Sequence, residues 1–192
     1  MVLLATAYIG SDVVVGGELE MGYLAELCGG KGNVAIIMGE PDQEGTIGRT
    51  QGYMNIMQKY PDMKEIVRGT SHWQRSQAQS LIENWLQAKK DFNIVAANDD
   101  EGAIGAILGM QSQNVDPKPY FIGGIDGTTD GLDVMNQGLL DCTVYQDARG
   151  QGKGSVDAAV DILQGKEVPD IIWIPYELVT PKDYETYMEK WK

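Results

Sequence analysis

The chain has 192 residues, of which 43% are hydrophobic and 22% are charged, and its formal net charge is -13 at pH 7. This composition is typical of a globular domain that buries a core, and no stretch approaches the ~18 consecutive apolar residues of a membrane span. The acidic charge argues against a nucleic-acid partner, because phosphate groups would be repelled.

Short apolar runs alternate with helical stripes along the whole chain. The runs predict strands, in chain order, at Thr6–Gly10, Asn33–Met38, Lys64–Arg68, Asn93–Ala97, Tyr120–Ile125 and Leu140–Gln146. The runs are nearly continuous stretches of apolar residues, as are the strands of parallel sheets that helices cover on both faces. The sequence therefore predicts an α/β fold with three αβα layers and a mostly parallel, Rossmann-like sheet.

Helices are expected between these strands. The first runs from about Val14 to Cys28 and ends at Gly29 and Gly30, which act as its C-terminal cap. The second covers about Gly48–Lys59 and stops before Pro61. Helical spacing in the third places Trp85 in the core.

Signatures of catalysis and of cofactor or metal binding are missing from the sequence. His72 is the single histidine, and the two cysteines, Cys28 and Cys142, are not spaced as a zinc pair, so we expect both in the core. The run Gly150–Ser155 departs from the phosphate-binding loop pattern at two positions. We predict no catalytic residue, no metal and no cofactor, and we conclude that the chain is not an enzyme.

The first seven residues, Met1–Ala7, lack the basic start of a secretion signal. We therefore identify no signal peptide in this chain.

Five side chains suited to hydroxyl groups follow the carboxyl ends of successive predicted strands, where open α/β sheets hold ligands. Arginine and aspartate give charged hydrogen bonds, asparagine and glutamine offer a donor and an acceptor, and an indole can stack on a sugar ring. We predict a site for a polyol from Arg49, Trp73, Asn98, Asp126 and Gln146.

Each of these residues has a structural alternative. Asp126 could only cap the helix expected at about Thr129–Gln137. Arg49 could be a surface cation and Trp73 a loop anchor. Asn98 could be a helix cap and Gln146 a solvated strand end. The acid pair Asp99 and Asp100 could serve acid–base chemistry or hold magnesium, but we interpret it, together with Glu101, as the charged first turn of a helix.

Several segments together resemble the type I periplasmic sugar-binding proteins of ABC importers, most closely the ribose-binding and the inositol- or rhizopine-binding branches. These segments are Tyr8–Asp12, Asn98–Ala106, Gly124–Thr128, Thr143–Gln146 and Glu177–Thr180. The resemblance implies non-covalent binding of a monosaccharide or inositol-like ligand, an ABC permease as partner, and a periplasmic or extracellular, lipoprotein-type location. It assigns ligand contacts to the same five residues, Arg49, Trp73, Asn98, Asp126 and Gln146.

Within the family, Trp73, Arg75 and the run Glu83–Leu86 favour the inositol branch over the ribose branch. The alternative is the effector domain of a lac-repressor-type transcription regulator, which shares the fold. Such a regulator needs a basic helix-turn-helix, which this acidic chain lacks.

The resemblance also implies that the chain is one lobe of a two-lobed fold and begins where the second lobe begins. We expect a single lobe over residues 1–192, with its core at 8–146, a segment at 147–170 that crosses to the first lobe, and a return strand and helix at 171–192. The helix at 147–166 carries an apolar stripe, made of Val156, Ala159, Val160 and Leu163. Because an exposed apolar stripe is an interaction patch, we predict a homodimer or a domain swap through this helix, or a repositioned helix.

Overall fold

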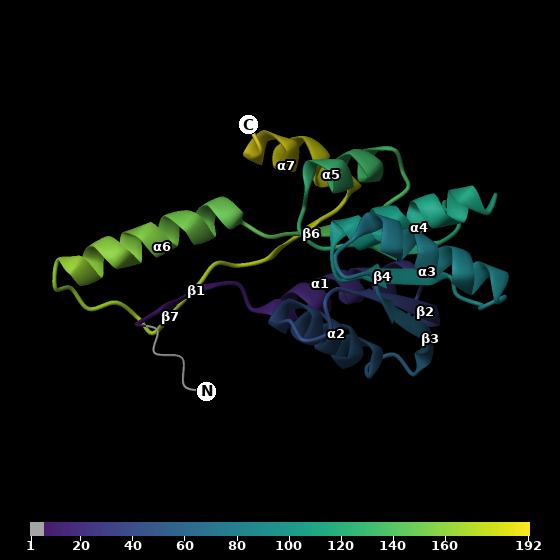
Figure 1. Cartoon of the computed structure of the whole chain (residues 1–192), viewed down its shortest axis with the longest axis horizontal. Coiled ribbons are helices and arrows are strands. Elements are labelled where there is room, and N and C mark those ends of the chain that lie inside the picture. The colour runs from purple at the N-terminus through teal and green to yellow at the C-terminus, as the bar shows by residue number, and fades with distance from the viewer. Residues whose placement is uncertain (1–5) are drawn as a thin grey trace. The chain divides into compact units, whose positions relative to one another are not determined.

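The computed structural model describes residues 6–192, so most of the segment Met1–Ala7 discussed above lies outside the described residues. The chain, which the sequence predicts to be a single lobe, divides into two compact units (Figure 1). The small unit consists of residues up to Asp12 together with Gln146–Tyr176, and the large unit consists of Val13–Tyr145 and Glu177–Lys192. Each unit is thus built from two stretches of the chain.

A four-stranded parallel sheet forms the centre of the large unit. Its strands are β2 (Lys31–Met38), β3 (Asp62–Thr70), β4 (Ile94–Ala97) and β5 (Phe121–Gly123), in the spatial order β3-β2-β4-β5. All four residues of β4 are buried, which agrees with the prediction of covered, continuously apolar strands.

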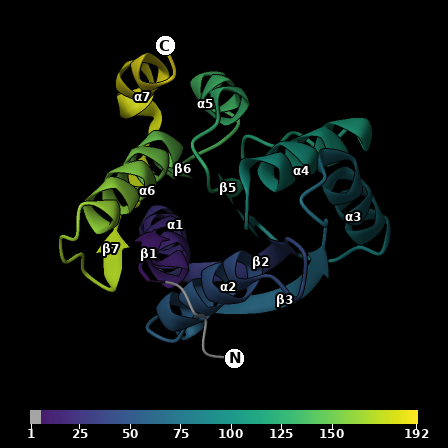
Figure 2. The ribbon, with the colours of Figure 1, turned by 60° about the vertical axis from the view of Figure 1, so that its left-hand side comes forward.

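Helices cover both faces of this sheet. They are α1 (Val13–Leu27), α2 (Glu44–Met57), α3 (Arg75–Gln87), α4 (Asp100–Ser112) and α5 (Thr129–Asn136). Alternate residues of β2 point to opposite faces, so Val34 and Ile36 join a core with α1 and α2, while Ala35 and Ile37 join a core with α3 and α4. Figure 2 shows these two helix pairs on opposite sides of the sheet. The predicted three-layer α/β architecture is confirmed.

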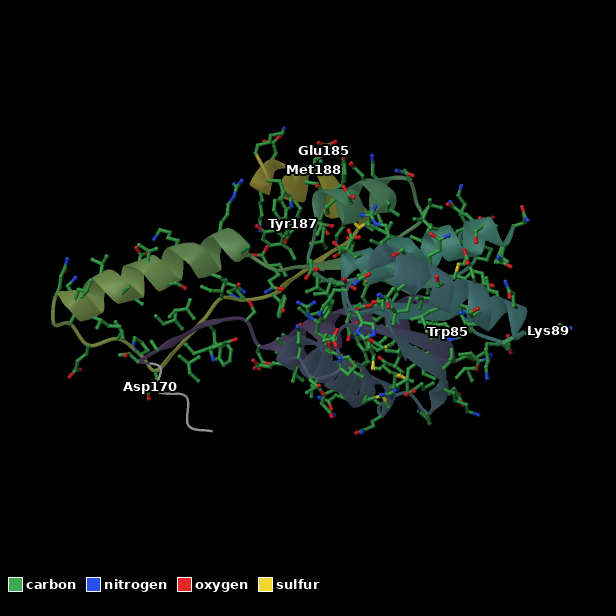
Figure 3. All side chains as sticks on the ribbon, viewed as in Figure 1. Trp85, Lys89, Asp170, Glu185, Tyr187 and Met188 are labelled. Carbon is green, nitrogen blue, oxygen red and sulfur yellow. The ribbon has the colours of Figure 1, made fainter. Side chains whose placement is uncertain are left out.

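The last strands and helices complete the large unit. The strand β6 (Thr143–Tyr145) pairs antiparallel with β8 (Glu177–Val179), and the chain then forms a 3-10 turn (Pro181–Asp183) and α7 (Tyr184–Lys190). Tyr187, labelled under α7 in Figure 3, packs edge-on against Tyr145 with ring centroids 5.3 Å apart.

From residue 6 onward, the small unit contains one helix and two strands. β1 (Tyr8–Gly10) pairs in parallel with β7 (Ile171–Trp173), and α6 (Ala148–Leu163) lies between them in the chain. The N-terminus of α6 is capped by Asp147, whose carboxylate accepts a hydrogen bond of 2.8 Å from the amide of Gly150. The predicted apolar stripe is exposed. The exposed fraction is 63% for Val156, 44% for Val160 and 87% for Leu163.

Several predicted details are confirmed, and several boundaries differ: β3 is longer than predicted, and β5 and β6 are shorter. Gly29 and Gly30 have positive φ values of 66° and 74° and end α1, and Trp85 and Cys142 are buried, whereas Cys28 is only partly buried. The start of α2 is Glu44 and not Gly48, so Arg49 lies inside the helix and not at its first turn. Among the described residues, no helix has both the length and the apolar character to cross a membrane.

Candidate functional site

Asp126 lies just beyond β5, where the sheet ends. Its amide donates a 2.8 Å hydrogen bond to the carbonyl of Val144, which extends the pairing toward β6. Its φ is 128° and that of Gly127 is 67°, so the chain turns sharply at this point. The cap of α5 is Thr128, whose hydroxyl accepts from the amide of Gly131 at 3.0 Å. The alternative that Asp126 is only a helix cap is therefore excluded.

Arg49 approaches Asp126 from α2. Its Nη1 lies 3.3 Å from Oδ1 of Asp126 and donates a 2.5 Å hydrogen bond to the main-chain oxygen of Asn98. Arg49 is 6% exposed, so the alternative of a surface cation is wrong. Asn98, Asp126 and Trp73 enclose its guanidinium. Its main chain packs closely on α1, where a Cβ on Gly17 would lie 2.0 Å from the carbonyl oxygen of Arg49.

Trp73 stands over Arg49 from the loop between β3 and α3. The ring centroid lies 5.9 Å from the guanidinium carbon of Arg49, and Nε1 donates a 2.8 Å hydrogen bond to Oε1 of Gln43. The indole ring packs directly against the main chain of Gly39, where an added Cβ would lie only 2.1 Å from the ring. Trp73 has a φ of 61°, which is uncommon outside glycine and is held here by the surrounding contacts.

Asn98 lies beneath this pair and is completely buried. Its Oδ1 accepts hydrogen bonds of 3.3 Å from both the amide of Gly39 and the hydroxyl of Thr50. Its Nδ2 is buried and has no hydrogen-bond partner among the described residues. In this structure Asn98 holds Arg49 and the loop at Gly39.

A cavity of about 430 Å³ opens beside these side chains, entirely within the large unit. It is lined by Gln43, Gly45, Arg49, Trp73, Asp99, Glu101 and Asp126. Three of the five predicted residues, Arg49, Trp73 and Asp126, thus share one cavity, with Asn98 behind them. Gln146 belongs to the small unit, where its Oε1 accepts from the hydroxyl of Tyr176 at 3.4 Å.

Sequence reasoning missed Gln43, Asp99 and Glu101 as lining residues. Asp99 is the N-cap of α4 and accepts a 3.1 Å hydrogen bond from the amide of Gly102, as expected for a first-turn acid. The sequence signal that Asp99 lines the cavity was its position just after the carboxyl end of β4, at the same sheet edge as Asp126.

The acids around the cavity hold protons more tightly than usual. Burial, together with the charge of Asp126, raises the pKa of Asp99 to about 7, and Asp99 is only 4% exposed. Burial also raises the pKa of Asp126 to about 7, with Asp100 and Glu101 acting in the same direction and Arg49 opposing them. At neutral pH the site therefore offers carboxyl groups as both acceptors and donors.

The chemistry available is recognition by hydrogen bonding. The guanidinium of Arg49 and the carboxylate of Asp126 form a pair that adjacent hydroxyl groups can engage, and the indole of Trp73 supplies a stacking surface. Over residues 6–192, no group of three or more His, Cys, Asp or Glu side chains is arranged to hold a metal ion.

The sequence model for a periplasmic binding protein domain matches residues 4–167, which is most of the chain. The chain belongs to this family. The resemblance to periplasmic binding proteins noted from the sequence is therefore confirmed.

Among the relatives of this binding-protein domain is a putative rhizopine-binding protein of Rhizobium meliloti, 38% identical over 96% of this chain. A ribose import binding protein of Bacillus subtilis is 32% identical over 91% of the chain. The structure is also similar to that of an ABC transporter solute-binding protein from Bacillus halodurans with bound myo-inositol, with a TM-score of 0.92 and 40% identity over 97% of the chain. These relatives are binding proteins and not enzymes.

The binding-protein domain described here is shorter than these relatives. It spans 60% of the Rhizobium protein, 55% of the Bacillus subtilis protein and 64% of the Bacillus halodurans chain.

Proposed function

We propose that this chain is the ligand-binding part of an ABC-importer solute-binding protein and that it binds a sugar or an inositol-like polyol without chemical change. The observation that carries the proposal is the pairing of Arg49 with Asp126 at the carboxyl edge of the sheet, with Trp73 over the guanidinium. A site built from such groups selects ligands with matching hydroxyls, because its buried polar atoms are unpaired without them.

The inositol-like class is favoured over ribose for two reasons. Trp73 gives a broad face for a six-membered ring, and the similar Bacillus halodurans protein carries myo-inositol in its crystal structure. Asn98 belongs to the proposed site as well, because its main-chain oxygen orients Arg49. Gln146, which the sequence also assigns to the ligand, lies in the small unit and stays a prediction.

Because the chain spans about 60% of its relatives, we propose that it corresponds to one lobe of a two-lobed protein whose other lobe completes the site. The expected partner of the complete protein is an ABC permease, and the expected location is periplasmic or extracellular. The net charge of -13 supports the absence of a nucleic-acid partner.

Isothermal titration calorimetry with myo-inositol, ribose, xylose and glucose tests the proposal. It should be run on the 192-residue chain and on a chimera whose preceding segment is taken from the Bacillus halodurans relative. We expect the strongest binding with myo-inositol in the chimera. Absence of heat from all four ligands in the chimera would exclude the sugar and polyol function.

We also propose that the 192-residue chain forms a homodimer or a domain swap through residues 147–166. The support is the exposure of Val156, Val160 and Leu163 on α6. Light scattering should give twice the mass of one chain, and Leu163→Glu should return it to the single mass. A single mass for the unmodified chain contradicts the dimer.

A further inference from the structure

The buried carboxylate of Asp100 lies behind the loop that carries Asp126 but outside the cavity lining. Asp100 is the first residue of α4 and is completely buried. A buried carboxylate is costly unless its oxygens are satisfied, so its partners indicate what it does.

Both oxygens of Asp100 bind the segments next to Asp126. Oδ2 accepts hydrogen bonds from the amide of Thr128 at 2.7 Å and from its hydroxyl at 2.8 Å. Oδ1 accepts from the hydroxyl of Thr143 on β6 at 2.6 Å. Thr143 in turn accepts from the amide of Gly127 at 3.1 Å.

The main chain of Asp100 completes the arrangement, because its amide donates a 2.7 Å hydrogen bond to the carbonyl of Ile125. The residues on both sides of Asp126 are therefore tied, directly or through Thr143, to Asp100. Asp126 itself has a φ of 128°, which costs energy for a residue with a Cβ and persists only where its surroundings fix it.

Two glycines leave room for this carboxylate. A Cβ on Gly124 would lie 2.7 Å from Oδ1 of Asp100, and a Cβ on Gly131 would lie 2.4 Å from Oδ2. The loop and the start of α5 thus fit closely around the Asp100 side chain, and a displaced carboxylate would displace both.

We propose that Asp100 is a positioning residue that holds Asp126 in the geometry required for ligand binding. This inference rests on the proposed function of the Arg49–Asp126 site. Asp100 touches no ligand in this scheme. It acts by fixing Ile125, Gly127 and Thr128, so that the Asp126 carboxylate meets Arg49 at 3.3 Å.

The substitution that tests the proposal is Asp100→Asn, which keeps the size of the side chain but replaces one accepting oxygen by a donor. The matched control is Asp141→Asn. Asp141 also accepts a main-chain hydrogen bond, from the amide of Ile122 at 2.7 Å, but it lies at the opposite end of β5 from Asp126.

The first readout needs no ligand. Amide hydrogen exchange at Asp126, Gly127 and Thr128 should become at least about 10-fold faster in Asp100→Asn and stay within about 2-fold in Asp141→Asn. Unchanged exchange at these three amides in Asp100→Asn would overturn the proposal.

The second readout is the Kd for myo-inositol, measured by calorimetry at a temperature where all variants are folded. Asp100→Asn should weaken binding by about 10- to 100-fold, because small displacements of a positioned group have effects of this size. In an Asp126→Asn background the same change should have an effect below about 3-fold, since Asp100 acts through Asp126.

An equal loss of affinity in both backgrounds would mean that Asp100 acts by another route, and it would overturn the proposal. If the unsubstituted protein binds no polyol at all, the proposed function fails. The exchange measurement then still decides whether Asp100 fixes the Asp126 loop.

Discussion

Nη1 of Arg49 lies 3.3 Å from Oδ1 of Asp126, and the two residues come from a helix and a loop on different parts of the sheet edge. The side chain of Arg49 is 7% exposed and that of Asp126 is 34% exposed. Both side chains line the cavity, and the carboxylate of Asp126 is the more exposed of the two. A ligand hydroxyl that reaches Asp126 also comes within the field of Arg49.

Replacing Asp126 by Asn should weaken the Kd for the preferred polyol by about 100-fold at a pH above 7, where the Asp126 carboxyl is ionised, because hydrogen bonds to a charged group contribute roughly 1.5–3 kcal/mol each. Calorimetry on the chimera measures the effect. The matched control is Asp133→Asn on α5, whose carboxylate accepts a 3.0 Å hydrogen bond from the hydroxyl of Tyr184 and lies outside the cavity lining. Equal affinities for the Asp126 variant and the unsubstituted protein would contradict the assignment of Asp126.

Gly39 should be required for the position of Trp73. A methyl group at Gly39 would lie 2.1 Å from the ring, so Gly39→Ala should move the indole away from Arg49. We expect about a 10-fold weaker Kd, consistent with losing roughly 1.4 kcal/mol of stacking. Tryptophan fluorescence and calorimetry measure the two effects.

Gly22→Ala serves as the control for this substitution. An added Cβ on Gly22 of α1 would meet nothing within 4 Å, and Gly22 lies outside the cavity lining. A weaker Kd in Gly22→Ala, of the same size as in Gly39→Ala, would show that the position of Trp73 is not responsible.

Stability should fall as the pH rises toward neutrality. The pKa of Asp99 is raised by burial to about 7, so between its ordinary value of 3.8 and about 7 the folded chain holds a proton that the unfolded chain has released. The free energy of unfolding should therefore decrease with rising pH in this window. Urea unfolding at about pH 5 and about pH 7.5 should give the higher midpoint at the lower pH.

Asp99→Asn removes the titrating group but keeps a good N-cap residue for α4. The dependence of the urea midpoint on pH should become weaker in this variant. It will not vanish, because burial also raises the pKa of Asp126 to about 7 and that of Asp100 to about 6. An unchanged pH dependence would exclude Asp99 as a contributor.

Much of the fold could be predicted because parallel strands buried on both faces are continuous apolar runs. The segments assigned to β2, β4 and β5 have this form, and the glycines after Leu27 mark the end of α1. The start of α2 was missed for a local reason: its N-cap residue, Gln43, makes no side-chain capping bond, so the sequence carries no start signal there.

The candidate site was predicted in part because the carboxyl ends of parallel strands lie at the same edge of the sheet. This reasoning identified Arg49, Trp73 and Asp126, but it missed Asp99 and the buried role of Asp100. Whether an acid in a first helical turn faces solvent or the protein depends on what packs against it. That information lies in distant segments, such as Thr143, and not in the local pattern.

Tyr145 and Glu177 are register partners in the antiparallel pair β6–β8, so the points where the chain leaves and re-enters the large unit lie side by side. A two-residue Asn-Gly turn is the favoured link between such strand ends. The large unit is therefore a candidate for excision as a continuous miniature protein, with residues 1–12 removed and 146–176 replaced by this turn. It should unfold in urea in one cooperative step, and a broad, non-cooperative transition would show that the large unit depends on the rest of the chain. The large unit, closed by this short hairpin, would then carry Arg49, Trp73 and Asp126 as a minimal scaffold for grafting new ligand specificities.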